Sequence, residues 1–135
     1  MGSTATTELV RALERVHRAA LQPRLALLGV HPGADLALAE IAAADGLTHA
    51  ELAERLRVRP PSVTKVLRTL ERDGLVFRLV DPDDARVSHV HLTREGRKLR
   101  PALRRAWQEA DTEVLAPLSA DERGRLRALL AKTLG

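Results

Sequence analysis

Hydroxyl-bearing and cationic side chains gather between residues 59 and 69 at spacings that place them on one face of a helix. Apolar residues recur at intervals of three and four in the same stretch and predict the buried stripe of that helix: Val63, Val66, Leu67 and Leu70. The helix is predicted to begin at Pro60 or Pro61, because proline suits the first helical turn. The outward face then carries Ser62, Thr64, Lys65, Arg68 and Thr69. Such side chains can contact phosphates and base edges.

The positive charge of the chain is concentrated around this helix. The net charge is +4 and the pI is about 10.6, but seven basic residues and only two acids lie between Arg55 and Arg78. A local basic patch favours a nucleic-acid partner. The first turn of the helix is also expected to present free amides and the positive end of the helix dipole to phosphate. Taken residue by residue, a merely solvated helix face is the more frequent explanation of such side chains.

The elements on both sides of this helix complete a recognisable motif. Residues 48–56 are predicted to form a short helix that opens with the capping box "THAE", and "RVRP" is the turn that follows. Ala53 falls where two helices cross closely, so the pair is typical of a helix-turn-helix. After Gly74, which is expected to cap the second helix in the left-handed conformation, the period changes to two. Residues 75–80 and 86–92 then predict a β-hairpin.

The remaining helices are predicted at residues 7–28, 34–44, 94–116 and 119–133. Pro23 lies within the first of them and is expected to kink or break it, whereas Pro101 is expected to bend the long one. Thr93 and Ser119 are the expected N-caps. The predicted fold is mainly α: a single domain over residues 1–135, in which a winged helix-turn-helix lobe with a two-stranded hairpin wing spans about 34–92.

Composition excludes several classes of protein. The chain has no cysteine, so disulfides, thiolate metal sites and thiol redox sensing are excluded. No apolar run approaches the roughly 20 residues of a membrane span, and we expect a cytoplasmic protein without membrane contact. The sequence offers no nucleophile–base pair, metal cluster or phosphate loop. We therefore predict no enzyme, no catalytic residue, no metal and no cofactor.

The motifs together resemble the MarR family of bacterial winged-helix repressors. The matching stretches are "LTHAELAERLRVRPPSVTKVLRTLERDGLV", "DPDDAR" and "HLTREGRKL", in the family's order and spacing. The resemblance implies a homodimer held by the helices at 7–28 and 94–133, which binds a palindromic operator in double-stranded DNA. It also implies a repressor that a small aromatic or anionic effector releases. The candidate DNA-binding residues are Arg59, Pro61, Ser62, Thr64, Lys65, Arg68 and Arg86.

Two positions depart from the family's pattern. Arg57 stands in the turn where members usually carry glycine or another small residue, so the turn is expected to differ slightly and Arg57 to add a phosphate contact. Ala85 stands where members often carry arginine in the wing, which is expected to weaken or relax wing binding.

Apolar residues in the terminal helices outnumber those that one small lobe can bury, which predicts dimerisation through these helices. They are Leu9, Leu13, Leu103, Trp107, Val114, Leu115, Leu118, Leu126, Leu129 and Leu130. Packing within one chain is the alternative. In a dimer, two recognition helices would reach successive major grooves, about 34–36 Å apart.

Weaker signals remain open at this stage. His17, Arg24 and Trp107 are candidates to line an effector pocket, although the binding residues are unknown. The alternative is that Trp107 belongs to the core and the other two lie on the surface. His49 is a candidate neighbour of phosphate. His89 and His91 share a strand face without a third metal ligand, so we expect them to face solvent or contact the backbone. A winged helix used only for protein contacts, or a ligand-independent DNA-binding protein, are the alternatives; steep salt dependence would indicate DNA binding.

The stretch "DPDDAR" is acidic although it lies in a basic region. Asp81 and Pro82 are typical of a turn, because Asp accepts local backbone hydrogen bonds and Pro fixes φ. Asp84 is predicted to hold the Arg86 guanidinium in a fork, which would aim it at a narrow minor groove. The family resemblance gives both residues the same roles.

Overall fold

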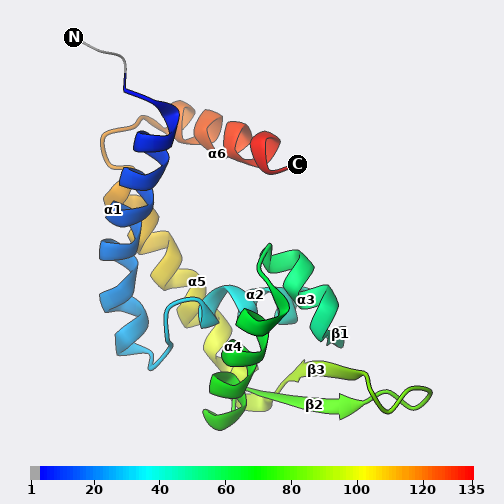
Figure 1. Cartoon of the computed structure of the whole chain (residues 1–135). Helices are drawn as coiled ribbons and strands as arrows, with labels where there is room; N and C mark the ends of the chain where they lie inside the picture. The colour runs from blue at the N-terminus through cyan, green and yellow to red at the C-terminus, as the bar shows by residue number, and fades with distance from the viewer. Residues whose placement is uncertain (1–3) are drawn as a thin grey trace. The chain divides into compact units, whose positions relative to one another are not determined.

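The computed structural model of the chain describes residues 4–135. Most of its secondary-structure elements are helices (Figure 1). The elements are α1 (Thr6–Leu27), α2 (Ala34–Ala43), β1 (Leu47–Thr48), α3 (His49–Leu56), α4 (Pro60–Arg72), β2 (Val76–Val80), β3 (Ser88–Leu92), α5 (Arg94–Val114) and α6 (Ala120–Leu134). They form two compact units. We call Leu25–Arg104 the winged unit, and the described residues up to Arg24 together with Arg105–Gly135 the helical unit.

The predicted helix boundaries hold because they depend on local hydrogen bonds. Thr48 and Glu51 form a complete capping box at α3, and Ser119 and Glu122 form a second one at α6. Gly74 adopts φ 73°, and the N–H of Leu75 after it donates to the Leu70 carbonyl at 2.9 Å. These bonds satisfy backbone groups that a helix end leaves free, so each helix starts or stops at a defined residue.

The structure excludes one of the two outcomes expected for Pro23 in α1, a break of the helix. Pro23 does not break the helix, which runs without interruption from Thr6 to Leu27. A proline removes one backbone donor and crowds the preceding turn, but a helix tolerates this where neighbouring contacts hold both sides. Leu25, two residues later, is only 2% exposed, so packing anchors the segment that follows the proline.

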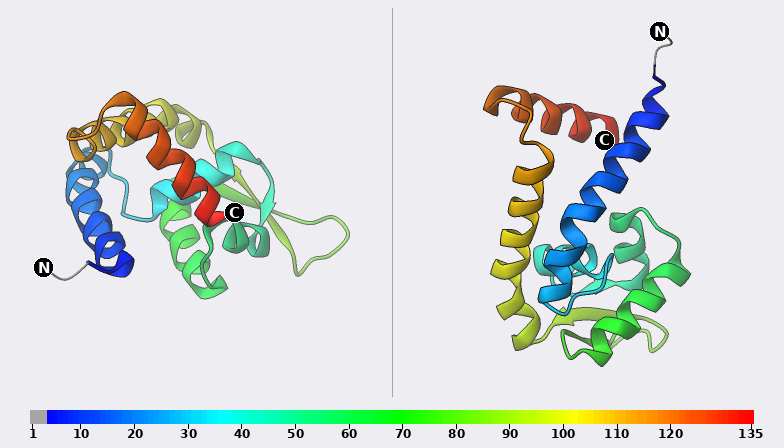
Figure 2. Two further views of the ribbon diagram at one scale, coloured as in Figure 1. Left: turned by 90° about the horizontal axis from the view of Figure 1, so that it is seen from above. Right: turned by 90° about the vertical axis from the view of Figure 1, so that its left-hand side faces the viewer.

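The sheet of the winged unit has three strands rather than the two expected. β2 and β3 form the predicted antiparallel hairpin, with Phe77 opposite His91 and Leu79 opposite His89. β1 adds itself to the other edge of β3, where Leu47 pairs with Val90. The loop of the hairpin extends away from the helices of this unit and forms the wing (Figures 1 and 2).

The core of the winged unit is aliphatic and joins every helix of the helix-turn-helix to the sheet. Its most deeply buried large side chains are Leu25, Ile41, Leu52, Leu67, Leu70, Val63 and Val90. Of the predicted α4 stripe, Val63, Leu67 and Leu70 are fully buried and Val66 is half-buried. The stripe therefore fixes which face of α4 points outward.

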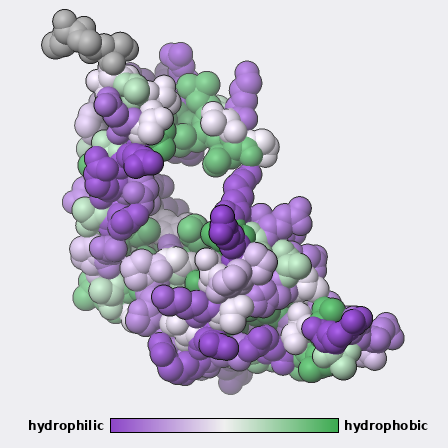
Figure 3. All heavy atoms as spheres, in the orientation of Figure 1, coloured by the Kyte–Doolittle hydropathy of each residue, from purple (hydrophilic) through white to green (hydrophobic). Residues whose placement is uncertain are grey.

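The helical unit leaves much of its apolar surface uncovered. α6 has no buried residue, and Leu129 and Leu134 are each 59% exposed. Leu9, at 58%, is exposed on α1 in the same way. Hydrophobic residues gather on the face over α6 in Figure 3. Among the described residues, no helix has the length and apolar character needed to cross a membrane.

Candidate nucleic-acid interface

The turn between α3 and α4 retains a left-handed residue although glycine is absent. Arg57 is the C-cap of α3 with φ 56° and ψ 42°, and its N–H donates to the Glu54 carbonyl at 3.1 Å. Val58 then donates to the Ala53 carbonyl at the same distance. A side chain in this conformation costs roughly 1–2 kcal/mol. The helix crossing is therefore held by hydrogen bonds and packing that offset local strain.

The outward face of α4 carries three cations that no carboxylate neutralises within the described residues. Arg59, Lys65 and Arg68 are all exposed, and none of them has an acidic partner in residues 4–135. Pro61 and Ser62 are exposed on the first turn between them. Unpaired cations aligned on a protruding helix face form a favourable surface for a polyanion, since binding does not first require an ion pair to break.

Thr64 is less available than the sequence indicated. It is half-buried, and its hydroxyl donates to the Pro60 carbonyl at 3.3 Å and lies 3.1 Å from Nε2 of His49. His49 Nε2 is also 3.1 Å from the Pro60 carbonyl oxygen, which can only accept. The ring nitrogen must therefore carry a proton for this contact. His49 connects α3 to the first turn of α4.

The expectation of free amides at the start of α4 was wrong. Pro60 and Pro61 have no N–H, and the next amide, that of Ser62, donates to the Arg59 carbonyl at 3.0 Å. Prolines suit the start of a helix, but they also remove the backbone donors of its first positions. Positive potential at this end of α4 therefore comes from the helix dipole and the side chain of Arg59.

The wing loop is organised by two of its own carboxylates. Asp81 Oδ1 accepts from the backbone N–H groups of Asp83, at 2.8 Å, and Asp84, at 3.0 Å. Asp84 accepts from Arg86 three times: from its backbone N–H at 3.0 Å, its Nε at 3.1 Å and its Nη2 at 3.3 Å. The predicted fork between Asp84 and Arg86 is thus present, and the Arg86 side chain is 90% exposed.

The electrostatics of the wing agree with this geometry. Hydrogen bonds from the Arg86 guanidinium, and then from its backbone N–H, hold the pKa of Asp84 below its ordinary value. Asp84 therefore stays ionised and keeps accepting from the guanidinium. The carboxylate restrains the arginine while leaving its outer edge open to solvent.

Both histidines of β3 contact acceptors on neighbouring segments. His89 lies 2.8 Å from the Gly46 carbonyl oxygen and 2.7 Å from Asp81 Oδ2, and His91 lies 3.2 Å from Asp45 Oδ1. The backbone contact expected for these residues is confirmed for His89. No group of three potential metal ligands lies together in the part of the chain that the structure describes.

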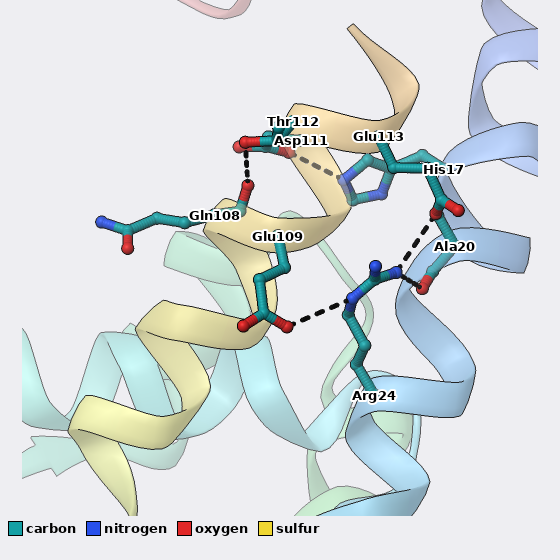
Figure 4. A network of polar contacts seen from close by, with 8 residues as sticks. All are labelled: His17, Ala20, Arg24, Gln108, Glu109, Asp111, Thr112 and Glu113. Carbon is teal, nitrogen blue, oxygen red and sulfur yellow. Dashed lines mark hydrogen bonds and ion pairs between the residues drawn. The ribbon is translucent and has the colours of Figure 1, made fainter. Parts of the chain in front are cut away.

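The helical unit contains a separate polar network (Figure 4). Arg24 of α1 lies 3.4 Å from Glu109 and 3.1 Å from Glu113 of α5, and also donates to the Ala20 carbonyl. His17 lies 3.1 Å from Asp111. Two of the candidate effector residues are therefore engaged in contacts between α1 and α5. The third, Trp107, is half-buried.

All predicted DNA-binding residues lie in the winged unit. Arg59 is the N-cap of α4, the others up to Arg68 lie on α4, and Arg86 lies in the wing loop. The His49 contact with Pro60 and the bridge formed by His89 were not predicted from the sequence. Both depend on residues far apart in the chain. The available signals were a histidine directly after the N-cap of α3 and a histidine eight residues after a turn aspartate.

Comparisons with known proteins agree with this geometry. The family model for the MarR family matches residues 35–88, which include the helix-turn-helix and most of the wing. An HTH-type transcriptional regulator of Mycobacterium tuberculosis is 42% identical over 92 residues, which are 68% of this chain and 64% of that protein. The chain belongs to the MarR family. The matched relative is named as a transcriptional regulator, a class of protein that is not an enzyme.

Other relatives of this MarR-family chain carry more specific names. The homoprotocatechuate degradative operon repressor of Escherichia coli is 36% identical over 80 residues, which cover 59% of this chain and 54% of the repressor. The chain thus matches less than two thirds of the length of these curated relatives.

Solved structures match over the whole chain. Apo MarR from E. coli superposes with a TM-score of 0.83 at 27% identity and covers 100% of both chains. MepR of S. aureus, solved as a complex with DNA, gives 0.85 at 28% identity and covers 98% of both. The winged helix-turn-helix fold is therefore confirmed.

Proposed function

We propose that this MarR-family chain is a sequence-specific, homodimeric DNA-binding repressor. α4 would enter the major groove with Arg59, Pro61, Ser62, Lys65 and Arg68, and the wing would place Arg86 in the minor groove. The observation that carries the proposal is the unpaired cationic face of α4, together with a wing arginine of the same unit that Asp84 holds. Such a regulator would act in the cytoplasm.

Thr64 has a modified role in this proposal. Because its hydroxyl donates to Pro60, its oxygen remains only as an acceptor and its methyl group as an apolar contact. It would therefore support the position of the helix start and offer at most an accepting contact to a base. Its neighbour His49 fixes the same turn from α3.

The homodimer is proposed to form through the terminal helices. α6 has no buried residue, and exposed leucines lie on α1 and α6 of the same unit. A symmetric partner would cover them, since an exposed apolar patch of this kind marks an interface. The family resemblance implies the same arrangement. Two copies of α4 would then read the halves of a palindromic operator in double-stranded DNA.

An effector is proposed on weaker support, as a small aromatic or anionic molecule. One relative is named for an operon that degrades homoprotocatechuate, an aromatic acid. Arg24 is a half-buried cation of the helical unit, but Glu109 and Glu113 already pair with it. An anionic effector would have to displace these carboxylates, so Arg24→Ala should remove any thermal shift that aromatic carboxylates induce.

The decisive experiment is selection of a duplex from a random double-stranded pool, followed by affinity measurements over a range of salt. The selected duplex should be palindromic, and log affinity should fall steeply with log salt. Lys65→Ala and Arg68→Ala should each weaken binding at moderate salt. Arg100→Ala, an exposed arginine of α5, is the charge-matched control. Failure to enrich any duplex would favour a winged helix used for protein contacts.

A further inference from the structure

His89 of β3 bridges two groups that can only accept hydrogen bonds. Its Nδ1 lies 2.8 Å from the Gly46 carbonyl oxygen, and its Nε2 lies 2.7 Å from Asp81 Oδ2. A neutral imidazole has a single N–H and can donate to one of them. Both contacts are hydrogen bonds only when the ring carries two protons. The His89 side chain is 31% exposed and that of Asp81 24%, so neither is fully hydrated.

The carboxylate that His89 contacts also shapes the wing loop. Asp81 uses Oδ2 for His89 and Oδ1 for the N–H groups of Asp83 and Asp84. The Asp84 side chain in turn holds Arg86. A continuous series of contacts therefore runs from the turn at Gly46 through the histidine and two aspartates to the wing arginine. All of these residues belong to the winged unit.

We propose that His89 is a positioning residue for DNA binding. In its doubly protonated form it ties Asp81 to the turn that precedes α3, and thereby fixes the loop that aims Arg86. The inference rests on the proposed function, because it assigns a consequence for DNA affinity to a residue that does not itself contact DNA. It also makes the wing responsive to pH.

The groups that face His89 favour its charged form. The contact with Asp81, followed by that with the Gly46 carbonyl, raises the pKa of His89 above its ordinary value, and Glu51 of α3 adds to the effect. The His89 contact likewise lowers the pKa of Asp81. Across the hairpin, the residue opposite is the uncharged Leu79, and the other β3 histidine, His91, is paired with Asp45.

The direction of the pH effect follows from these shifts. Because the pKa of His89 is raised by folding, its stabilising contribution is complete below the ordinary value of 6.5 and is lost as pH rises through the raised value. For Asp81 the pKa is lowered, so its contribution is complete above the ordinary value of 3.8 and lost as pH falls through the lowered value. The wing anchor is therefore complete between these two ordinary values.

The test compares DNA affinity of the full chain at about pH 5 and about pH 8, within the window where histidine titrates. The probe is the duplex that wild type selects from the random pool. Wild type should lose several-fold in affinity as pH rises, and His89→Gln should bind weakly with a flatter profile. His31→Gln is the matched control, since His31 is exposed outside this network.

Loss of a positive charge would weaken DNA binding even without any positioning role. A double-mutant cycle with Arg86→Ala separates the two explanations. If His89 acts through Arg86, the loss of affinity caused by His89→Gln should disappear in the Arg86→Ala background. An undiminished loss there would overturn the inference, while leaving the proposed function intact.

A second measurement does not need DNA. In histidine-selective NMR of the free protein, both ring nitrogens of His89 should be protonated at about pH 5, and the amide signals of Asp83 and Asp84 should shift with the His89 midpoint. Asp81→Asn should lower that midpoint. If the amide signals of Asp83 and Asp84 shifted with a midpoint different from that of His89, the inference would be contradicted, whether or not the random pool yields a duplex. Absence of DNA binding with a shared midpoint would contradict the proposed function, and of the inference only the coupling between His89 and the wing loop would remain.

Discussion

His49, the first residue of α3, places its Nε2 3.1 Å from the carbonyl oxygen of Pro60, the first residue of α4. The two helices of the helix-turn-helix are thus connected by a polar contact as well as by their apolar cores. Because Pro60 and Pro61 bring no amide to the first turn, the carbonyl of Pro60 and the hydroxyl of Thr64 are the groups through which α3 fixes that turn.

Replacement of His49 by alanine should therefore loosen the start of α4. We expect a loss of about 1 kcal/mol in the free energy of unfolding, the usual value of one hydrogen bond, and a DNA affinity that falls several-fold. Denaturant unfolding and binding titrations measure the two effects. His31→Ala, which changes an exposed histidine outside the contact, is the control.

The salt dependence distinguishes this role from a direct phosphate contact. If His49 only positions α4, the slope of log affinity against log salt should be the same in His49→Ala and wild type. A slope reduced by about one would instead indicate that His49 neutralises a phosphate.

Removal of the acid at position 84 should weaken DNA binding, although it makes the protein more positive. Asp84→Ala frees the Arg86 guanidinium from its fork, so the arginine must be ordered when DNA binds. We expect a several-fold loss of affinity for the selected duplex, measured at moderate salt.

Asp83→Ala is the matched control for that change. Asp83 lies one residue away in the same loop, is exposed, and uses only its backbone N–H to bond Asp81. The Asp83→Ala substitution removes the same charge but leaves the fork between Asp84 and Arg86 intact. DNA affinity should therefore stay equal or rise slightly. If both variants bound DNA more tightly than wild type, plain electrostatics would account for the wing and the aiming role would be wrong.

Local periodicity and capping were readable from the sequence because they depend on neighbours in the chain. The buried stripe of α4 and the boxes at Thr48 and Ser119 are examples, since the groups involved lie within one or two helical turns. β1 was not predicted. Two residues are too short for a pattern, and Leu47 becomes a strand residue only by pairing with Val90.

In the candidate site, too, contacts between near neighbours in the chain were predictable and contacts between distant residues were not. The fork between Asp84 and Arg86 spans two residues and was predictable, whereas the Gly46 carbonyl that His89 contacts lies 43 residues earlier. Thr64 was assigned an outward role because periodicity alone does not reveal that His49 lies beside it. Contacts of this kind depend on how α3, α4 and the sheet pack, which the sequence pattern does not specify.

Gly96, in the first turn of α5, should not tolerate a side chain. A Cβ built there would lie 2.2 Å from the carbonyl oxygen of Leu75, and that oxygen already accepts from the N–H of Thr93 at 3.0 Å. Gly96→Ala should therefore lower the free energy of unfolding by roughly 1–3 kcal/mol, as overpacking does. Denaturant unfolding gives the value.

Gly124→Ala should change the free energy of unfolding in the opposite direction. This glycine lies inside α6, and a Cβ there meets no atom within 4 Å among the described residues. Alanine is the better helix former by about 1 kcal/mol, so this variant should be more stable than wild type. If Gly96→Ala were equally stabilised, helix propensity would outweigh the contact with Leu75, and the close approach would not constrain the position.

Dimerisation should depend on the exposed leucines of α6. Leu129 is 59% exposed in the single chain, and a carboxylate at that position would be buried in the proposed interface without a partner. Leu129→Glu should therefore shift the mass in solution from twice 14.8 kDa to that of one chain, or unfold the protein if the monomer is unstable. Light scattering at micromolar concentration and circular dichroism distinguish these outcomes.

Leu36→Glu is the control for the dimer experiment. Leu36 is 55% exposed on α2, which is close to the exposure of Leu129. The same substitution therefore adds the same charge at a similarly exposed leucine outside the terminal helices. This variant should keep the mass of wild type and its cooperative unfolding. A wild-type mass of one chain, or an unchanged mass and stability in Leu129→Glu, would mean that α6 lies outside any dimer interface. The apolar surface on this helix would then require another partner, and palindromic DNA recognition by two linked copies of α4 would lose its physical basis.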